Sequence, residues 1–268
     1  MKLKNTRFGI TIILNACFAA TALGAPSLPP LVVAIRHADC EGAIKLVNTD
    51  SAKNDDQTVF VAGRMLDEGL CVKQDSAGAT AYFARAAELG NRRAKIDYAA
   101  KMGLGEGTPQ SYELAGAACR GAGFDPDSKL THYSLGYACT LAGVAGKIMR
   151  ESLPMGAFLP DSGAAVIEFN PTASEIQIRS TPHVGHSERA TGSNLSLPKV
   201  DAEREFKKAW AQALATAPKP DPARLENQTV QLEIDVDMML EVKRDVVQRQ
   251  MLNAPLYQGD IRHMGTPN

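Results

Sequence analysis

The first half of the chain alternates amphipathic stretches with short polar breaks. The clearest stretch begins at Asp75, a good N-cap residue, and ends at Gly90-Asn91, with apolar and small side chains at helical spacing between them. Glycine followed by asparagine is typical of a helix end. The preceding segment, Thr58–Gly69, is also amphipathic and is joined to it by the short loop LCVKQ. The pattern therefore predicts antiparallel helix pairs.

Small residues repeat along this half with a period of about 36. Three alanines stand 36 residues apart, and a second column has a small residue every 36 or 37 positions, with a softer or larger apolar residue three positions later. A fixed period of this length is typical of stacked helical hairpins, in which small side chains let backbones approach closely. The two columns are Ala43, Ala79 and Ala115, and Gly63, Ala99 and Gly136.

Two runs in this region resemble the Sel-one-like repeat family, which is related to the tetratricopeptide repeats. They are AGRMLDEG at Ala62–Gly69 and DSAGATAYFARAAELGN at Asp75–Asn91. The resemblance covers about residues 36–146 and implies a mainly α fold, a helix-hairpin solenoid over residues 31–147. More divergent copies follow at Ala94–Gly123 and Leu130–Gly146, and a degenerate helix precedes them at Ala38–Val47.

The pattern changes after a Pro/Gly-containing stretch at residues 148–162, which we interpret as a linker. Residues 163–240 read as strand, strand, helix, strand, and thus as a small α+β domain. This order resembles the C-terminal domain of the TonB energy-transducer family, which implies a role in the cell envelope. The matching segments are VIEF, EIQIRSTP, VDAEREFKKAW and VQLEIDVDM. Residues 241–268 form a polar tail.

The N-terminus predicts export. Residues 1–25 combine three basic residues, an apolar run and a small-residue exit, as a secretory signal peptide does. Two alternatives stay open: an uncleaved membrane anchor, and a lipidated Cys17 in a lipobox-like sequence. The formal net charge of −1 argues against nucleic acid as a partner. A membrane would be contacted only through this N-terminus.

Cleavage would leave four cysteines in an oxidising compartment, where disulfides form. Cys40 on the leading helix and Cys71 just after the next one are expected at the same end of a hairpin. Cys119 and Cys139 lie on consecutive helices. We therefore favour the pairs 40–71 and 119–139. The alternative is four buried thiols that fill space between alanine-rich helices.

Enzymatic chemistry finds little support. The sequence LVVAIRHAD around Arg36 and His37 resembles the strand and Arg-His opening of histidine phosphatases, which would make His37 a nucleophile. Small-residue helices follow it, however, where alternating strands and helices would be expected. His183 and His186 stand in a polar loop without further ligands nearby. We expect no catalytic residues, no cofactor and no metal.

The repeats favour binding. Solenoids of this size bind through variable side chains on the first helix of each pair, so Arg64, Lys101 and Tyr137 are the expected contact residues. The edge of the last strand, within residues 229–240, could pair with an extended segment of an envelope protein. The expected function is a non-catalytic periplasmic or secreted interaction module with a protein or peptide partner. The alternatives are a histidine-phosphatase-like hydrolase and a membrane-anchored relative of the energy transducers.

Overall fold

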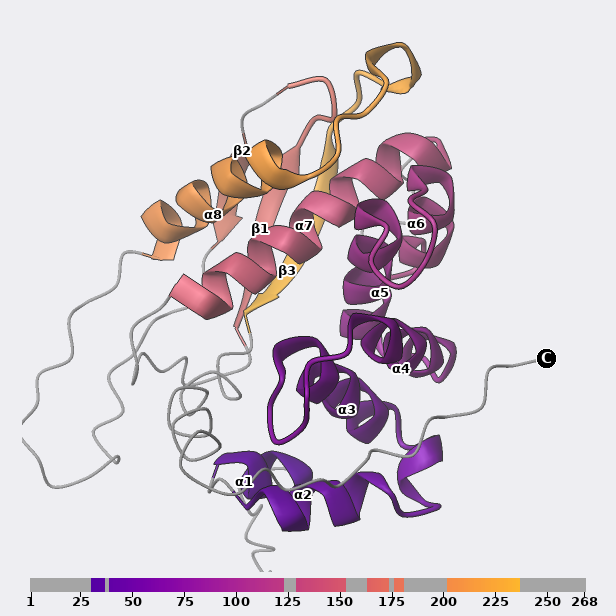
Figure 1. The fold of residues 1–268 in the computed structure, drawn as a ribbon. Helices are drawn as coiled ribbons and strands as arrows, with labels where there is room; N and C mark the ends of the chain where they lie inside the picture. Colours follow the sequence, from indigo (N-terminus) through magenta and orange to yellow (C-terminus); the bar gives the residue numbers. More distant parts are fainter. Residues whose placement is uncertain are drawn as a thin grey trace, which may run out of the picture.

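The chain folds into a series of helices followed by a small antiparallel sheet (Figure 1). The computed structural model describes residues 30–36, 39–122, 129–152, 163–173, 176–180 and 202–236. The predicted signal peptide, Cys17, His37, His183, His186 and the tail 241–268 lie outside these ranges. The helices are α1 (Pro30–Arg36), α2 (Cys40–Val47), α3 (Asp56–Glu68), α4 (Ser76–Glu88), α5 (Arg92–Leu104), α6 (Tyr112–Cys119), α7 (His132–Ser152) and α8 (Ala202–Thr216).

The helix starts repeat with the period of the alanine column. α2, α4 and α6 begin behind the N-caps Asp39, Asp75 and Ser111, which are 36 residues apart. Each cap side chain accepts a hydrogen bond from the backbone N–H three residues later, which satisfies one of the free donors at a helix start. The short polar residue four positions before each alanine therefore fixes where the second helix of every pair begins.

Small residues lie where helices cross closely. The three alanines of the first column are completely buried. A Cβ at Gly136 on α7 would lie 1.8 Å from the carbonyl oxygen of Tyr112, and one at Gly116 on α6 would lie 1.8 Å from that of His132. The backbones of α6 and α7 are therefore in direct contact, which only glycine permits at these positions.

The sheet has the order β2-β1-β3, with both pairs antiparallel. The strands are β1 (Gly163–Phe169), β2 (Ile176–Ser180) and β3 (Val230–Val236). The predicted sequence of two strands, a helix and a strand is thus confirmed. Phe169 on β1 packs against Tyr137 on α7 and edge-on against Trp210 on α8, at centroid distances of 6.3 and 4.9 Å. Both helices consequently cover the same face of the sheet (Figure 1).

The buried apolar residues form two clusters, and their boundary lies in the first turn of α5, between Ala94 and Ile96. The N-terminal cluster runs from Leu31 to Ala94 and contains α1 to α4. The C-terminal cluster runs from Ile96 to Leu232 and joins α5, α6 and α7 to α8 and the sheet. This differs from the boundary expected at residues 148–162. The reason is that α7 continues to Ser152, past the expected repeat end at 147, and packs on α5 and α6 with one side and on α8 and β3 with another.

The segment after α8 also contacts the helices that precede the sheet, in addition to the contacts made by α7. Tyr112 donates its hydroxyl hydrogen bond to the carbonyl of Pro218, and the backbone N–H of Asp221 donates to Tyr133 Oη at 2.7 Å. The guanidinium of Arg224 lies 3.8 Å above the ring of Tyr133 and pairs with Glu113 on α6. These contacts, together with α7, make residues 96–232 one packed unit. None of the helices in the described ranges is long and apolar enough to cross a bilayer.

Candidate interaction site

A network of charged side chains joins the two apolar clusters. Asp67 on α3 lies between two lysines: its Oδ1 binds Lys101 Nζ on α5, and its Oδ2 is 3.2 Å from Lys147 Nζ on α7. Lys101 also pairs with the carboxylate of Glu106 just after α5. The side chains of Asp67 and Lys101 are only 6% and 5% exposed. Three helices from both clusters thus meet at one ion network.

The start of α4 is bound into the same network. Ser76 Oγ lies 3.2 Å from Lys101 Nζ and 3.3 Å from Glu106 Oε2. Thr80 Oγ1 donates to the main-chain carbonyl of Glu106 at 2.8 Å. Because buried polar groups are costly unless paired, this set of mutual contacts fixes how the α3–α4 hairpin sits on α5 and α7.

Both central groups are held in their charged forms. Burial by itself would raise the pKa of Asp67, but attraction and hydrogen bonding to Lys101 and Lys147 outweigh it and leave this pKa below its usual value. Burial would likewise lower the pKa of Lys101, but Asp67 and Glu106 raise it above its usual value. A group that must accept or release a proton near neutral pH would need the opposite shifts, so neither residue is poised for acid–base catalysis.

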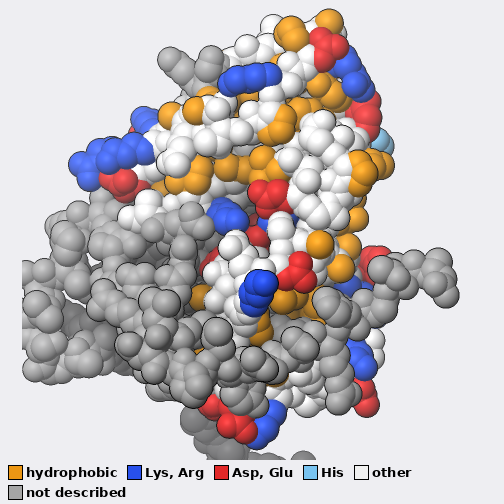
Figure 2. Space-filling view, in the orientation of Figure 1, with side chains coloured by type: hydrophobic (Ala, Val, Ile, Leu, Met, Phe, Trp, Pro, Cys, Tyr) orange, Lys and Arg blue, Asp and Glu red, His pale blue; other side chains and the backbone are white. Residues whose placement is uncertain are grey.

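The network borders a small cavity of about 30 Å³, which is also lined by apolar side chains such as Phe83 and Leu104. Its walls include Asp67, Asp97, Lys101 and Lys147. On the face of the molecule drawn in Figure 2, acidic and basic side chains gather in a hollow near the centre. A volume of this size holds about two water molecules and no organic substrate. The described residues also contain no group of three or more His, Cys, Asp and Glu side chains that could hold a metal ion.

The three expected contact residues lie inside the protein, which corrects that expectation. Arg64 is 2% exposed and donates from Nε to Glu68 on the same helix at 2.7 Å. Lys101 belongs to the buried ion network, and Tyr137 is 7% exposed with its ring edge-on to Tyr112. Charged and aromatic residues were assumed to face outward, whereas each of these is buried against partners in its own or a neighbouring helix.

Sequence reasoning missed Asp67, Glu106 and Lys147. One feature could have identified Asp67: it lies four residues after Gly63 and therefore on the same helix face as the small-residue column, which is a buried face. An acid on such a face requires a cationic partner. Nothing in the local sequence indicates that the partners come from α5 and α7, because they lie 34 and 80 residues further along the chain.

The sheet offers backbone groups for contact at its edges. β1 pairs with both other strands, so β2 and β3 each have one ladder partner among the described residues and one further edge. β3 is the longer of the two, with seven residues against five. Thr229, directly before it, is exposed. An edge strand presents N–H and C=O groups that an extended segment can pair with.

Comparison of this chain with protein-family models, with curated proteins and with solved structures finds no match in any of the three.

Proposed function

We propose that this chain is a non-catalytic, exported interaction module that binds an extended segment of a protein in the cell envelope along the edge of β3. In this proposal residues 31–147 form a Sel-one-like solenoid and residues 163–240 a TonB-like C-terminal unit. The observation that carries it is the position of β3 at the end of the sheet order β2-β1-β3, where its outer backbone edge is not used by another described strand.

The charge arrangement supports binding over catalysis. The buried acids and bases of the ion network neutralise one another, and the cavity beside them accommodates water only. The phosphatase alternative depends on a strand that leads into Arg36 and His37. Residues Pro30–Arg36 form helix α1, so this strand is absent and the alternative loses its structural basis.

Two disulfides point to folding in an oxidising, exported environment. The pairs are Cys40–Cys71 and Cys119–Cys139, the two that the sequence analysis favoured. Structural disulfides are rare in reducing compartments. Periplasmic or secreted localisation through residues 1–25 is therefore part of the proposal.

Site-specific photo-crosslinking in the native envelope tests the proposal. A photoreactive amino acid is placed at Thr229, beside the start of β3, and at Gln177, an exposed position on the opposite edge strand β2, as the matched control. We expect a specific crosslinked envelope or secreted protein from position 229 and not from position 177. Equal crosslinking from the two edges, or none above background from either, would contradict binding along β3.

A further inference from the structure

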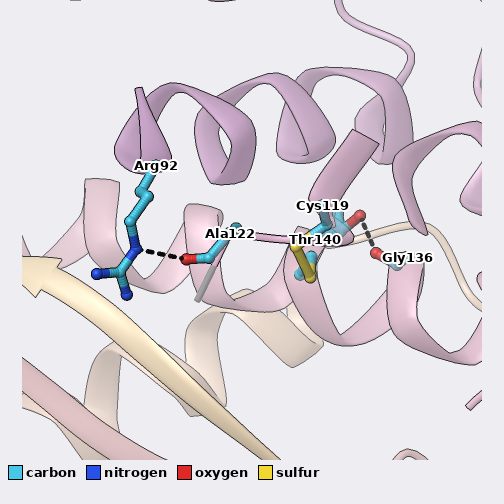
Figure 3. Close-up of a disulfide and its surroundings, with 6 residues drawn as sticks. Arg92, Cys119, Ala122, Gly136 and Thr140 are labelled. Atoms are coloured by element: carbon cyan, nitrogen blue, oxygen red, sulfur yellow. Dashed lines mark hydrogen bonds between the residues drawn. A yellow bond between two sulfur atoms is a disulfide. The ribbon is translucent and has the colours of Figure 1, made fainter. Parts of the chain in front are cut away.

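The two disulfides lie in different surroundings. Cys119 and Cys139 are completely buried, and their bond lies between helices of the C-terminal cluster (Figure 3). Nearby, Arg92 Nε donates to the carbonyl of Ala122 at 3.2 Å and holds the chain after α6 against α5. In the other bond Cys71 is buried but Cys40 is partly exposed. Cys40–Cys71 is therefore the disulfide nearer to solvent, whereas at Cys119–Cys139 the core must open before a thiol can reach the bond.

The Cys40–Cys71 bond fastens the terminal helices to the rest of the chain. It joins the first residue of α2 to the segment between α3 and α4. α1 and α2 lie at one end of the helical array (Figure 1) and pack more extensively on one another than on α3. Their apolar side chains, such as Leu31, Ile35 and Ile44, belong to the same buried cluster as Phe60 of α3. The terminal pair thus covers an apolar face of α3.

The backbone at Cys71 is under strain. Its φ is +59°, in the left-handed region that side chains other than those of glycine rarely adopt. A strained residue persists only where its surroundings hold it, and here the bond to Cys40 is one of the constraints. Among the described residues, Cys71 is the only non-glycine residue in the left-handed region, so this backbone feature distinguishes the Cys40–Cys71 site from the other disulfide.

We propose that the sulfur of Cys40 is a site of thiol–disulfide exchange for a dithiol reductant, and that opening the bond releases α1–α2 from α3. A thiolate of the reductant attacks Cys40 Sγ; the sulfur–sulfur bond breaks, and the Cys71 sulfur leaves as a thiolate that takes up a proton. The second thiol of the reductant then attacks the mixed disulfide and releases Cys40. Two electrons pass from the dithiol, which becomes a disulfide, to the cystine, which becomes two thiols.

The bond makes a substantial contribution to keeping the terminal pair in place. The sequence separation of the two cysteines is 31 residues. On the loop-entropy relation, a cross-link of this span favours the closed arrangement by roughly two to three orders of magnitude. This inference stands independently of the proposed binding along β3, since it concerns the opposite end of the molecule.

Graded reduction of the oxidised full chain tests the inference. The protein is incubated with increasing dithiothreitol under native conditions, alkylated, and mapped by mass spectrometry. We expect Cys40 and Cys71 to be labelled at least about 100-fold faster than Cys119 and Cys139. Hydrogen exchange on the same samples should show faster exchange of the α2 amides by a similar factor, with α7 unchanged.

The variant Cys40→Ser/Cys71→Ser should show the same loss of protection in α2 without any reductant, and dithiothreitol should not increase it further. If this variant fails to accumulate, the chemically reduced wild-type protein carries the same measurement. Labelling of all four cysteines at one rate would overturn the exchange site. Selective reduction of Cys40–Cys71 with unchanged protection of α2 would overturn the release of the terminal helices.

Discussion

Replacing Lys101 by methionine should weaken the connection between the two apolar clusters. The substitution keeps most of the side-chain volume but removes the ammonium group that binds Asp67 and Glu106. Asp67 then remains 6% exposed with Lys147 as its cationic partner, at 3.2 Å and with a side chain that is 32% exposed. The variant therefore leaves a buried carboxylate partly uncompensated, while no cavity is created.

The expected loss of stability depends on the interactions that Asp67 keeps in the variant. Removing one partner of a buried ion pair costs about 3–5 kcal/mol when nothing replaces it, and a single hydrogen bond to a charged group is worth about 1.5–3 kcal/mol. Because Lys147 stays in contact, we expect a loss of about 2–4 kcal/mol in the free energy of unfolding. For a chain of this size that corresponds to a decrease in Tm of roughly 4–16 °C.

Urea unfolding followed by circular dichroism measures this loss. The matched control is Lys45→Met, which removes an i,i+4 ion pair with Glu41 whose side chains are 70% and 56% exposed, and which should cost at most about 0.5 kcal/mol. The double variant Asp67→Leu/Lys101→Met should be more stable than Lys101→Met alone, since the buried carboxylate is gone and the remaining charges of Lys147 and Glu106, whose side chains are 32% and 41% exposed, can be hydrated. Equal effects of Lys101→Met and Lys45→Met would refute the argument that the network holds the clusters together.

Two further predictions concern the acid limit of stability and the contact between α6 and α7. The pKa of Asp67 in the folded protein lies below its unfolded value of about 3.9, so its contribution is fully present above that pH and is lost as the pH falls through the folded value. Unfolding free energies measured between pH 7 and pH 3 should consequently fall less steeply for Asp67→Asn than for the wild type; parallel curves would contradict this. Gly136→Ala should cost roughly 3 kcal/mol or more, because the added Cβ would lie 1.8 Å from a backbone oxygen of Tyr112 and force the helices apart. Calorimetry should show this loss, whereas Leu114→Ala at a 53% exposed position of α6 should change stability by less than about 0.5 kcal/mol.

Local features of the fold could be predicted because they depend on residues close together in sequence. The alanine and glycine columns predicted the close helix packing, and Asp75 predicted the start of α4. Antiparallel hairpins brought the cysteines within reach of the right partners. Each of these follows from periodicity or capping, which a single sequence displays.

The errors concern contacts between distant segments. The linker expected at 148–162 failed at its start because the proline and glycine residues that suggested it come after Ser152, where α7 ends. Arg64 and Lys101 were placed on the surface because their charge was considered without their partners, which are Glu68 one turn away and Asp67 on another helix. The contact of Arg224 with Tyr133, across 91 positions of the chain, leaves no periodic trace at all.

The position of Trp210 gives the protein an intrinsic optical reporter. It is the single tryptophan of the chain, is 2% exposed, and stacks edge-on against Phe169, while its indole Nε1 has no hydrogen-bond partner in the described part of the structure. An indole in such dry surroundings emits at shorter wavelength than one in water. Its fluorescence therefore reports the opening of the cluster shared by α7, α8 and the sheet. We expect no change in this signal when α1 and α2 move at the other end of the molecule.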